Sequence, residues 1–168
     1  MIMEIERQFL MEKFPDLPEI DSAQVWQGYL STAPVVRIRR FSHPDGSDRY
    51  EMTVKGKGTL VRAEVNIPIE AAQYEEMAGL LTREPIHKDY HVYRLPDGLK
   101  LECSAVDAGT DHGFMYAEVE FDSVEAANAF VPPSFLGREV TEVRDFSMSH
   151  YWVKGRLDFI FDDDGDVK

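Results

Sequence analysis

The segment Met3–Leu10 alternates polar and apolar side chains near the start of the chain. Side chains two positions apart lie on the same face of a β-strand, so Glu4, Glu6 and Gln8 are predicted to point the same way. Two carboxylates on one strand face repel each other unless a cation or basic side chains lie nearby. This pair therefore predicts cationic partners elsewhere in the chain.

Charges of one sign recur at alternate positions in later segments. Arg37 and Arg39 share one face of a predicted strand, and Glu118 and Glu120 share a face of another. A solvated sheet face tends to mix the two signs, so this segregation favours a common interior site. The other residues on the predicted polar faces are Lys55, Arg62, Glu64, Asn66, Lys88, Tyr90, Lys100, Glu102 and Ser104.

Paired carboxylates beside separate cations suit one class of ligand. Hard cations such as Mg²⁺ or Mn²⁺ bind carboxylate oxygens and bridge to phosphate oxygens, while arginine and lysine neutralise the remaining phosphate charge. We therefore expect a complex of a divalent metal with a polyphosphate, rather than a sugar or an apolar ligand.

The elements that position these side chains are mostly β-strands, because hydrophobic side chains recur with a period of two. Strands are predicted over residues 3–10, 24–30, 35–41, 50–55, 59–67, 86–95, 99–106 and 114–121. A helix is predicted over 68–81, with Pro68 in its first turn, and a shorter one to Phe130 with Ser123 as its N-cap. The following residues to about 161 are predicted to form a short helical or irregular cover.

Two arrangements of these strands are open on the alternation alone. In the first, the polar residues form the wet outer face of an antiparallel sheet whose other face packs on the core. In the second, about eight strands close into a barrel whose lumen holds side chains and one small ligand. Closure would bring the segregated charges together.

Composition limits the class of protein and of partner. A chain of 168 residues with 43% hydrophobic residues can bury a full core. The formal net charge of −13 argues against a nonspecific nucleic-acid partner, which needs clustered positive charge. Cys103 is the only cysteine, which excludes an intrachain disulfide and a cysteine-based zinc site. With no long apolar run and a charged amino terminus, we expect a cytoplasmic protein without a membrane partner.

Several segments, taken in order, resemble a known family. The amino-terminal run from Glu4 to Leu10 resembles the E-x-E-x-K signature of the CYTH domain, found in the triphosphate tunnel metalloenzymes. That family includes inorganic triphosphatases, thiamine triphosphatase and class IV adenylate cyclases. The resemblance covers some 140 residues and includes 27–30, 36–39, 53–56, 62–64, 86–88, 117–120 and 137–141.

The resemblance implies an α+β, mainly β fold: an eight-stranded antiparallel closed β-barrel with helices packed outside, forming one domain over 1–161 followed by an acidic tail, 162–168. It implies Mg²⁺ or Mn²⁺ as the cofactor. The implied metal ligands are Glu4, Glu6, Glu64, Glu102, Glu118 and Glu120. The implied phosphate-binding residues are Arg37, Arg39, Lys55, Arg62 and Lys88. The residues implied to act in catalysis are Glu4, Glu6, Lys55, Glu118 and Glu120.

The chain departs from the family pattern at several charged positions. Gln8 stands where the signature has lysine, and Tyr90 falls in a segment that lacks the family's inward arginine. Ser104 and Asn66 stand where carboxylates are expected. In the last motif Val143 replaces an aspartate, and Arg144 lies out of register.

These losses leave four functional hypotheses. The first is metal-dependent hydrolysis of inorganic tripolyphosphate or of a nucleoside or thiamine triphosphate. The second is a catalytically reduced module that binds a nucleotide or polyphosphate. The third is adenylate cyclase activity, and the fourth is a structural role with no anionic ligand. A homodimer is a further hypothesis. Cys103 is predicted to be a buried structural thiol, Arg7 to be a surface residue, and the scattered histidines to have no catalytic role.

Overall fold

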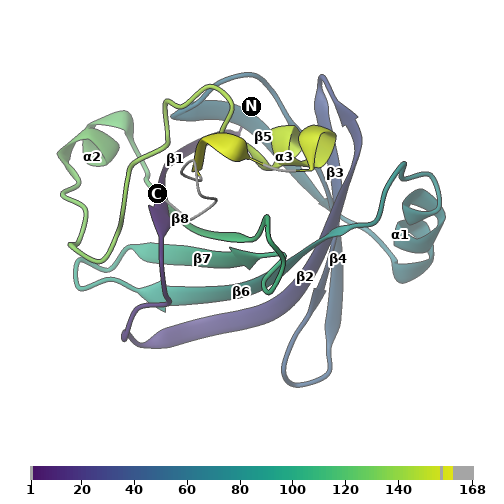
Figure 1. The fold of residues 1–168 in the computed structure, drawn as a ribbon, viewed down its shortest axis with the longest axis horizontal. Helices are drawn as coiled ribbons and strands as arrows, with labels where there is room; N and C mark the ends of the chain where they lie inside the picture. Colours follow the sequence, from purple (N-terminus) through teal and green to yellow (C-terminus); the bar gives the residue numbers. More distant parts are fainter. Residues whose placement is uncertain (1, 156, 161–168) are drawn as a thin grey trace.

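The computed structural model describes residues 2–155 and 157–160 and shows a closed barrel of eight antiparallel strands. Around the barrel the strands run in the order β1-β5-β4-β3-β2-β6-β7-β8 (Figure 1). The closed-barrel prediction is therefore confirmed. The predicted acidic tail, 162–168, lies outside the described residues, and the proposed domain limits stay a prediction.

The strands agree with the sequence prediction to within two residues at most ends. They are β1 (Met3–Met11), β2 (Glu19–Thr32), β3 (Val35–Ser42), β4 (Asp48–Lys55), β5 (Val61–Pro68), β6 (Ile86–Arg94), β7 (Lys100–Val106) and β8 (Phe114–Glu120). The prediction for β2 was too short by about five residues at its start, where Glu19 and Asp21 pair with β6. Charged residues at this exposed end obscured the alternation.

The strand register explains why charges of one sign meet inside the barrel. Directly paired residues of antiparallel strands share a face, and Glu118 of β8 pairs with both Gln8 of β1 and Glu102 of β7. Glu6 likewise pairs with Glu120. Alternation therefore places the carboxylates of three neighbouring strands on the inner wall.

Apolar side chains on the outer barrel face pack against the covering segments. One cluster includes Phe9, Val119 and Ala127 and lies beneath α2 (Val124–Ala129). Ser123 caps this helix as predicted, since its side chain accepts a hydrogen bond from the Ala126 amide.

The helix α3 (Met148–Lys154) lies across one end of the barrel (Figure 1). Tyr151 and Trp152 are buried there, and the ring of Trp152 lies 5.9 Å from that of Tyr29 on β2. The expectation of a short helical or irregular cover is thus confirmed for the described residues after Phe130. None of the helices in 2–155 and 157–160 is long and apolar enough to cross a membrane.

The predicted helix over 68–81 is wrong in its limits, because α1 spans only Ala71–Ala78. Pro68 is the last residue of β5, where it pairs with Glu51 of β4. Glu70 is the N-cap and forms a capping box with Gln73, so the helix starts at Ala71, three residues later than proline alone suggested.

Arg7 is not a simple surface residue, contrary to prediction. Its guanidinium pairs with Glu139 and donates to the carbonyls of Ala127 and Phe130 at 2.8 Å each. Its side chain is 15% exposed. It therefore fixes the C-terminal end of α2 to β1.

Candidate functional site

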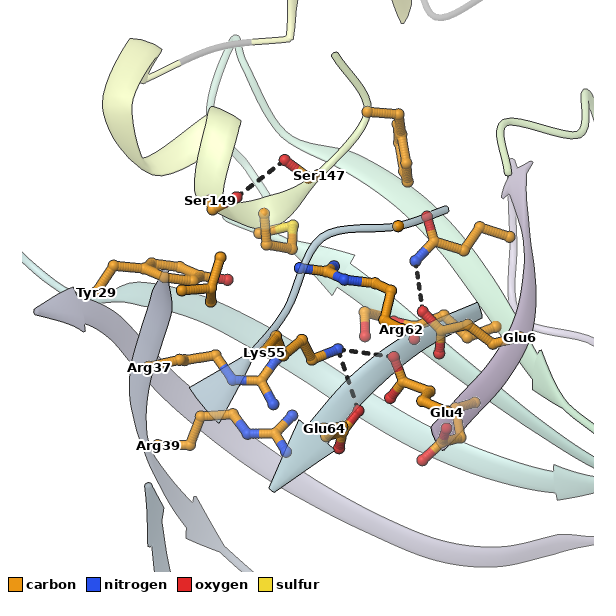
Figure 2. A pocket seen from close by; sticks show the side chains of 18 of the residues that line it. Glu4, Glu6, Tyr29, Arg37, Arg39, Lys55, Arg62, Glu64, Ser147 and Ser149 are labelled. Carbon is orange, nitrogen blue, oxygen red and sulfur yellow. Dashed lines mark hydrogen bonds and ion pairs between the residues drawn. The ribbon is translucent and has the colours of Figure 1, made fainter. Parts of the chain in front are cut away.

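The barrel encloses a cavity of about 890 Å³. Every residue that the family resemblance implied for metal binding, phosphate binding or catalysis lines it. These residues are Glu4, Glu6, Arg37, Arg39, Lys55, Arg62, Glu64, Lys88, Glu102, Glu118 and Glu120. Figure 2 shows Arg37 and Arg39 extending from one wall toward Lys55, with Glu4 and Glu6 on the opposite side.

Three carboxylates converge on the acidic side of the cavity. One oxygen from each of Glu4, Glu6 and Glu120 lies within 4.8 Å of the others. Within the described residues this is the only group of histidine, cysteine or acidic side chains placed closely enough to hold an ion together. Because all donors are carboxylate oxygens, the set fits a hard divalent cation such as Mg²⁺ or Mn²⁺.

The pKa values of the buried neighbours Glu6 and Glu118 are shifted in opposite directions. Burial raises the pKa of Glu6 well above its usual value, and the neighbouring charges of Glu118 and Glu4 add to that rise. Burial opposes ionisation of Glu118 as well, but the hydrogen bond with Glu6 and the cations Lys88, Lys55 and Arg37 lower its pKa. Of the two carboxyl groups, Glu6 is therefore the more readily protonated, and a bound divalent cation would compete with its proton.

Glu120 is also protonated more readily than an ordinary glutamate. Burial, together with the charges of Glu102, Glu4 and Glu118, raises its pKa to about 7. Ionised carboxylates held this close repel one another, and a bound cation would neutralise that repulsion on this side of the cavity.

The opposite wall offers hydrogen-bond donors to an anion. Arg37 and Arg39 project from β3, and the Nε atoms of both are buried without a hydrogen-bond partner among the described residues. Burial, followed by the charge of Arg39, lowers the pKa of Arg37. An arriving phosphate would satisfy these donors and offset the repulsion between the two guanidinium groups.

Lys88 is the most deeply buried lysine of this wall, with 5% of its surface exposed. Its Nζ donates to the Tyr116 hydroxyl at 2.6 Å. Burial lowers its pKa to about 7 and the nearby arginines contribute, although Glu118 acts in the opposite direction. A polyanion in the cavity would keep this lysine charged.

Lys55 joins the two sides of the cavity. Its Nζ lies 3.0 Å from Glu4 Oε1 and 3.4 Å from Glu64 Oε2, and its side chain is 10% exposed (Figure 2). Arg62, which pairs with Glu4 in the ladder between β1 and β5, donates from Nε to the Gly56 carbonyl. Arg62 lies on β5, which pairs with β1, whereas Lys55 lies one strand further away on β4 and reaches Glu4 through its long side chain.

Three departures from the family pattern place a neutral donor against a cavity glutamate. Gln8 Nε2 donates to Glu6 Oε1 at 2.8 Å. The amide of Asn66 donates to Glu64. The hydroxyl of Tyr90 donates to Glu102, and burial together with that carboxylate raises the tyrosine pKa. Neutral hydrogen bonds thus replace charges at these positions.

Several cavity residues were missed by the sequence prediction. They are Tyr29, Glu51, Arg144, Ser147 and Ser149. Glu51 shares the polar face of Lys55, so alternation carried the signal, and it pairs with Arg39 and Arg49. Arg144 lines the cavity although it is out of register with the motif, because its segment is irregular and strand alternation does not apply.

The residues predicted to lack a catalytic role lie elsewhere. The described lining of the cavity includes no histidine. Cys103 is fully buried, and burial raises the pKa of its thiol to about 12. The prediction of a buried thiol is confirmed.

Sequence comparison finds a similar protein that covers most of this chain. The chain is 40% identical over 139 residues to the inorganic triphosphatase of Nitrosomonas europaea. The aligned region covers 83% of this chain and 89% of the relative. The chain belongs to the CYTH, or triphosphate tunnel metalloenzyme, family. It is therefore an inorganic triphosphatase homologue. No family model matches the chain.

Solved structures of this family share the fold. The crystal structure of the inorganic triphosphatase NE1496 is similar with a TM-score of 0.65 and 32% identity, over 94% of this chain and 99% of the other. A putative adenylyl cyclase from Hippeastrum, reported to have a dominant triphosphatase activity, is similar with a TM-score of 0.54 over 94% of this chain and 97% of the other. Its 14% identity supports the shared fold alone.

Proposed function

We propose that this protein hydrolyses inorganic triphosphate in the barrel cavity with the help of a divalent cation. The observation that carries the proposal is the opposition, inside one cavity, of three converging carboxylates and a wall of buried cations. The similarity to an inorganic triphosphatase supports the choice of substrate.

The proposed roles follow the two walls. Glu4, Glu6 and Glu120 would hold Mg²⁺ or Mn²⁺, which supplies charge neutralisation at the transferred phosphoryl group and activation of the attacking water. Arg37 and Arg39 would bind phosphate oxygens through their unpartnered Nε donors.

Two lysines and Glu6 complete the proposed site. Lys88 would neutralise the charge that develops on the leaving pyrophosphate, since its ammonium lies deep in the same wall. Lys55 would hold the phosphate chain next to the ion, because it already borders Glu4. Because the pKa of Glu6 is raised, protons would compete with the ion, so ion binding would weaken as the pH falls.

A substrate panel tests this proposal. Metal-stripped protein is supplied with Mg²⁺ or Mn²⁺ and with tripolyphosphate, ATP or thiamine triphosphate, and the release of phosphate and pyrophosphate is measured. We expect turnover of tripolyphosphate, equal amounts of the two products, and no activity in excess EDTA.

The same panel tests the binding-module and cyclase hypotheses. Thermal stabilisation by tripolyphosphate without product release would favour a binding module, because a ligand specific to the folded state stabilises it by mass action. Release of pyrophosphate and cyclic AMP from ATP would favour a cyclase. Either outcome contradicts the proposed hydrolysis of inorganic triphosphate.

A further inference from the structure

One carboxylate, that of Glu51 on β4, lies among the cations of the basic wall. Glu51 lines the cavity and pairs directly across the strands with Arg39 of β3. Its Oε1 forms an ion pair with Arg39 Nη2, and its Oε2 lies 3.0 Å from Arg49 Nη1. Two guanidinium groups therefore enclose one carboxylate, in a set of three side chains that we term the Glu51 group.

Packing and charge hold the Glu51 group in place. The guanidinium carbons of Arg39 and Arg49 lie 4.9 and 3.8 Å from the centre of the Phe41 ring, which is buried. The Glu51 side chain is 14% exposed. Burial opposes its ionisation, but the charge of Arg39 and the hydrogen bond from it lower the pKa of Glu51, and Arg37 and Arg49 contribute. The group therefore contains an ionised carboxylate at neutral pH.

The Glu51 group lies at the end of the basic wall that is farther from α3. Tyr29, whose ring packs against α3, pairs with Arg37 of β3. The next residues of β3 that line the cavity are Arg39 and then Phe41, which is apolar. The cations of this strand therefore end where Glu51 lies. A polyphosphate that extended beyond Arg39 would meet a carboxylate instead of free donors.

We propose that Glu51 is a specificity-determining residue, which as an internal anion occupies the position that a further phosphate group would take between Arg39 and Arg49. The inference rests on the proposed function for the binding of a polyphosphate to this wall. Guanidinium groups bind carboxylate and phosphate oxygens with the same two-point geometry, so either anion can fill this position. The unpartnered Nε of Arg39 stays available to a triphosphate, whereas a longer chain must compete with Glu51.

Calorimetry with tripolyphosphate and with tetrapolyphosphate, in EDTA to prevent hydrolysis, tests this proposal. Glu51→Gln removes the charge and keeps the shape of the side chain. We expect it to lower the Kd of tetrapolyphosphate by at least about tenfold and that of tripolyphosphate by less than about threefold, because the longer chain alone reaches the released guanidinium groups. Equal changes for the two ligands, or no change for either, would overturn the proposal.

Asp48→Asn is the matched control. Asp48 of β4 pairs with Arg40 of β3 at 2.9 Å, so the same two strands carry a second ion pair of the same kind. Neither of these residues belongs to the described lining of the cavity. The control removes one negative charge and should change both Kd values by less than about threefold. A tenfold gain for tetrapolyphosphate in this variant would assign the effect to net charge and overturn the role of Glu51.

Arg49→Gln examines the other side of the proposed position. In the Glu51→Gln background it should abolish the gain for tetrapolyphosphate, because one of the two released guanidinium groups is then missing. In the wild-type background it should raise either Kd by less than about threefold, since Arg49 is paired with Glu51. A tenfold weakening there would show that Arg49 already binds phosphate, which would overturn the proposal even if Glu51→Gln did not fold.

Hydrolysis of tripolyphosphate in Mg²⁺ by the wild-type protein separates the two proposals. Turnover in the wild-type protein, with no gain for tetrapolyphosphate in Glu51→Gln, would contradict the role of Glu51 alone. A gain for tetrapolyphosphate in that variant, with no turnover in the wild-type protein, would contradict the proposed function alone.

Discussion

At the scale of single residues, the most unusual group is the buried lysine of the basic wall. The Lys88 side chain is buried, donates one hydrogen bond to Tyr116 and lies near other cations. Such a residue costs stability in its charged form, and a function that requires the charge explains its retention.

The pH dependence of stability tests the burial of Lys88. Its pKa is about 7 in the folded protein and near its ordinary value of 10.5 when unfolded. Between these values the unfolded chain binds more protons, so the free energy of unfolding rises with pH, by up to about 1.4 kcal/mol per unit. Urea unfolding in EDTA at pH 7.0 and 8.5 measures this rise, which Lys88→Met should lack. Equal slopes in the two proteins would contradict the shift.

Gln8 is the residue at which the family signature loses a charge. We predict that Gln8→Lys raises turnover of tripolyphosphate several-fold, because an ammonium beside Glu6 would lower its raised pKa and ease metal binding. Gln8→Met is the uncharged control. A rate for Gln8→Lys that stays at the wild-type value would show that the missing charge does not limit activity.

At the scale of elements, Arg7 connects a strand, a helix and a loop. We predict that Arg7→Leu lowers the free energy of unfolding by about 2 kcal/mol, since it leaves the carbonyls at the end of α2 and the carboxylate of Glu139 without their charged donor. Arg138→Leu, at an exposed neighbouring arginine, should change it by less than about 0.5 kcal/mol. Equal losses in a denaturant titration would contradict the anchoring role.

The strands were predictable because each has polar side chains on the face toward the cavity and apolar side chains on the opposite face. Alternation located the inner carboxylates and cations of β1, β3, β5 and β8 before the structure placed them in one cavity. The limits of α1 depended on a capping box, and the position of Arg144 depended on an irregular segment. Hydrogen bonds between side chains, such as that from Asn66 to Glu64, depend on side-chain conformation and had no periodic signal.

At the scale of the whole molecule, the negative charge shapes how a triphosphate is bound. A formal net charge of −13 opposes the approach of a free polyanion, whereas a complex with a divalent metal carries less charge. The cavity concentrates cations against that field on one wall. Metal and substrate are therefore expected to bind cooperatively.

Metal addition should stabilise the folded protein even without substrate. A cation at Glu4, Glu6 and Glu120 relieves repulsion that is absent from the unfolded chain, and a concentration of 100 times Kd adds about 2.7 kcal/mol. Denaturant unfolding with Mn²⁺ or with EDTA measures the difference. Glu120→Gln should reduce it, and an unaltered response in that variant would contradict the assignment of the ion to this group.

The most direct test of the central claim is the rate of phosphate release from tripolyphosphate in Mg²⁺ by the wild-type protein, Glu4→Ala and Glu118→Ala. Unfolding curves first establish that each variant is folded. The account predicts that the rate falls by at least about 10²-fold in each variant. Glu4 is a proposed ligand of the ion, and Glu118 interacts with the cations Lys88, Lys55 and Arg37 in the same cavity. Release at the wild-type rate in either folded variant would contradict hydrolysis in the barrel cavity.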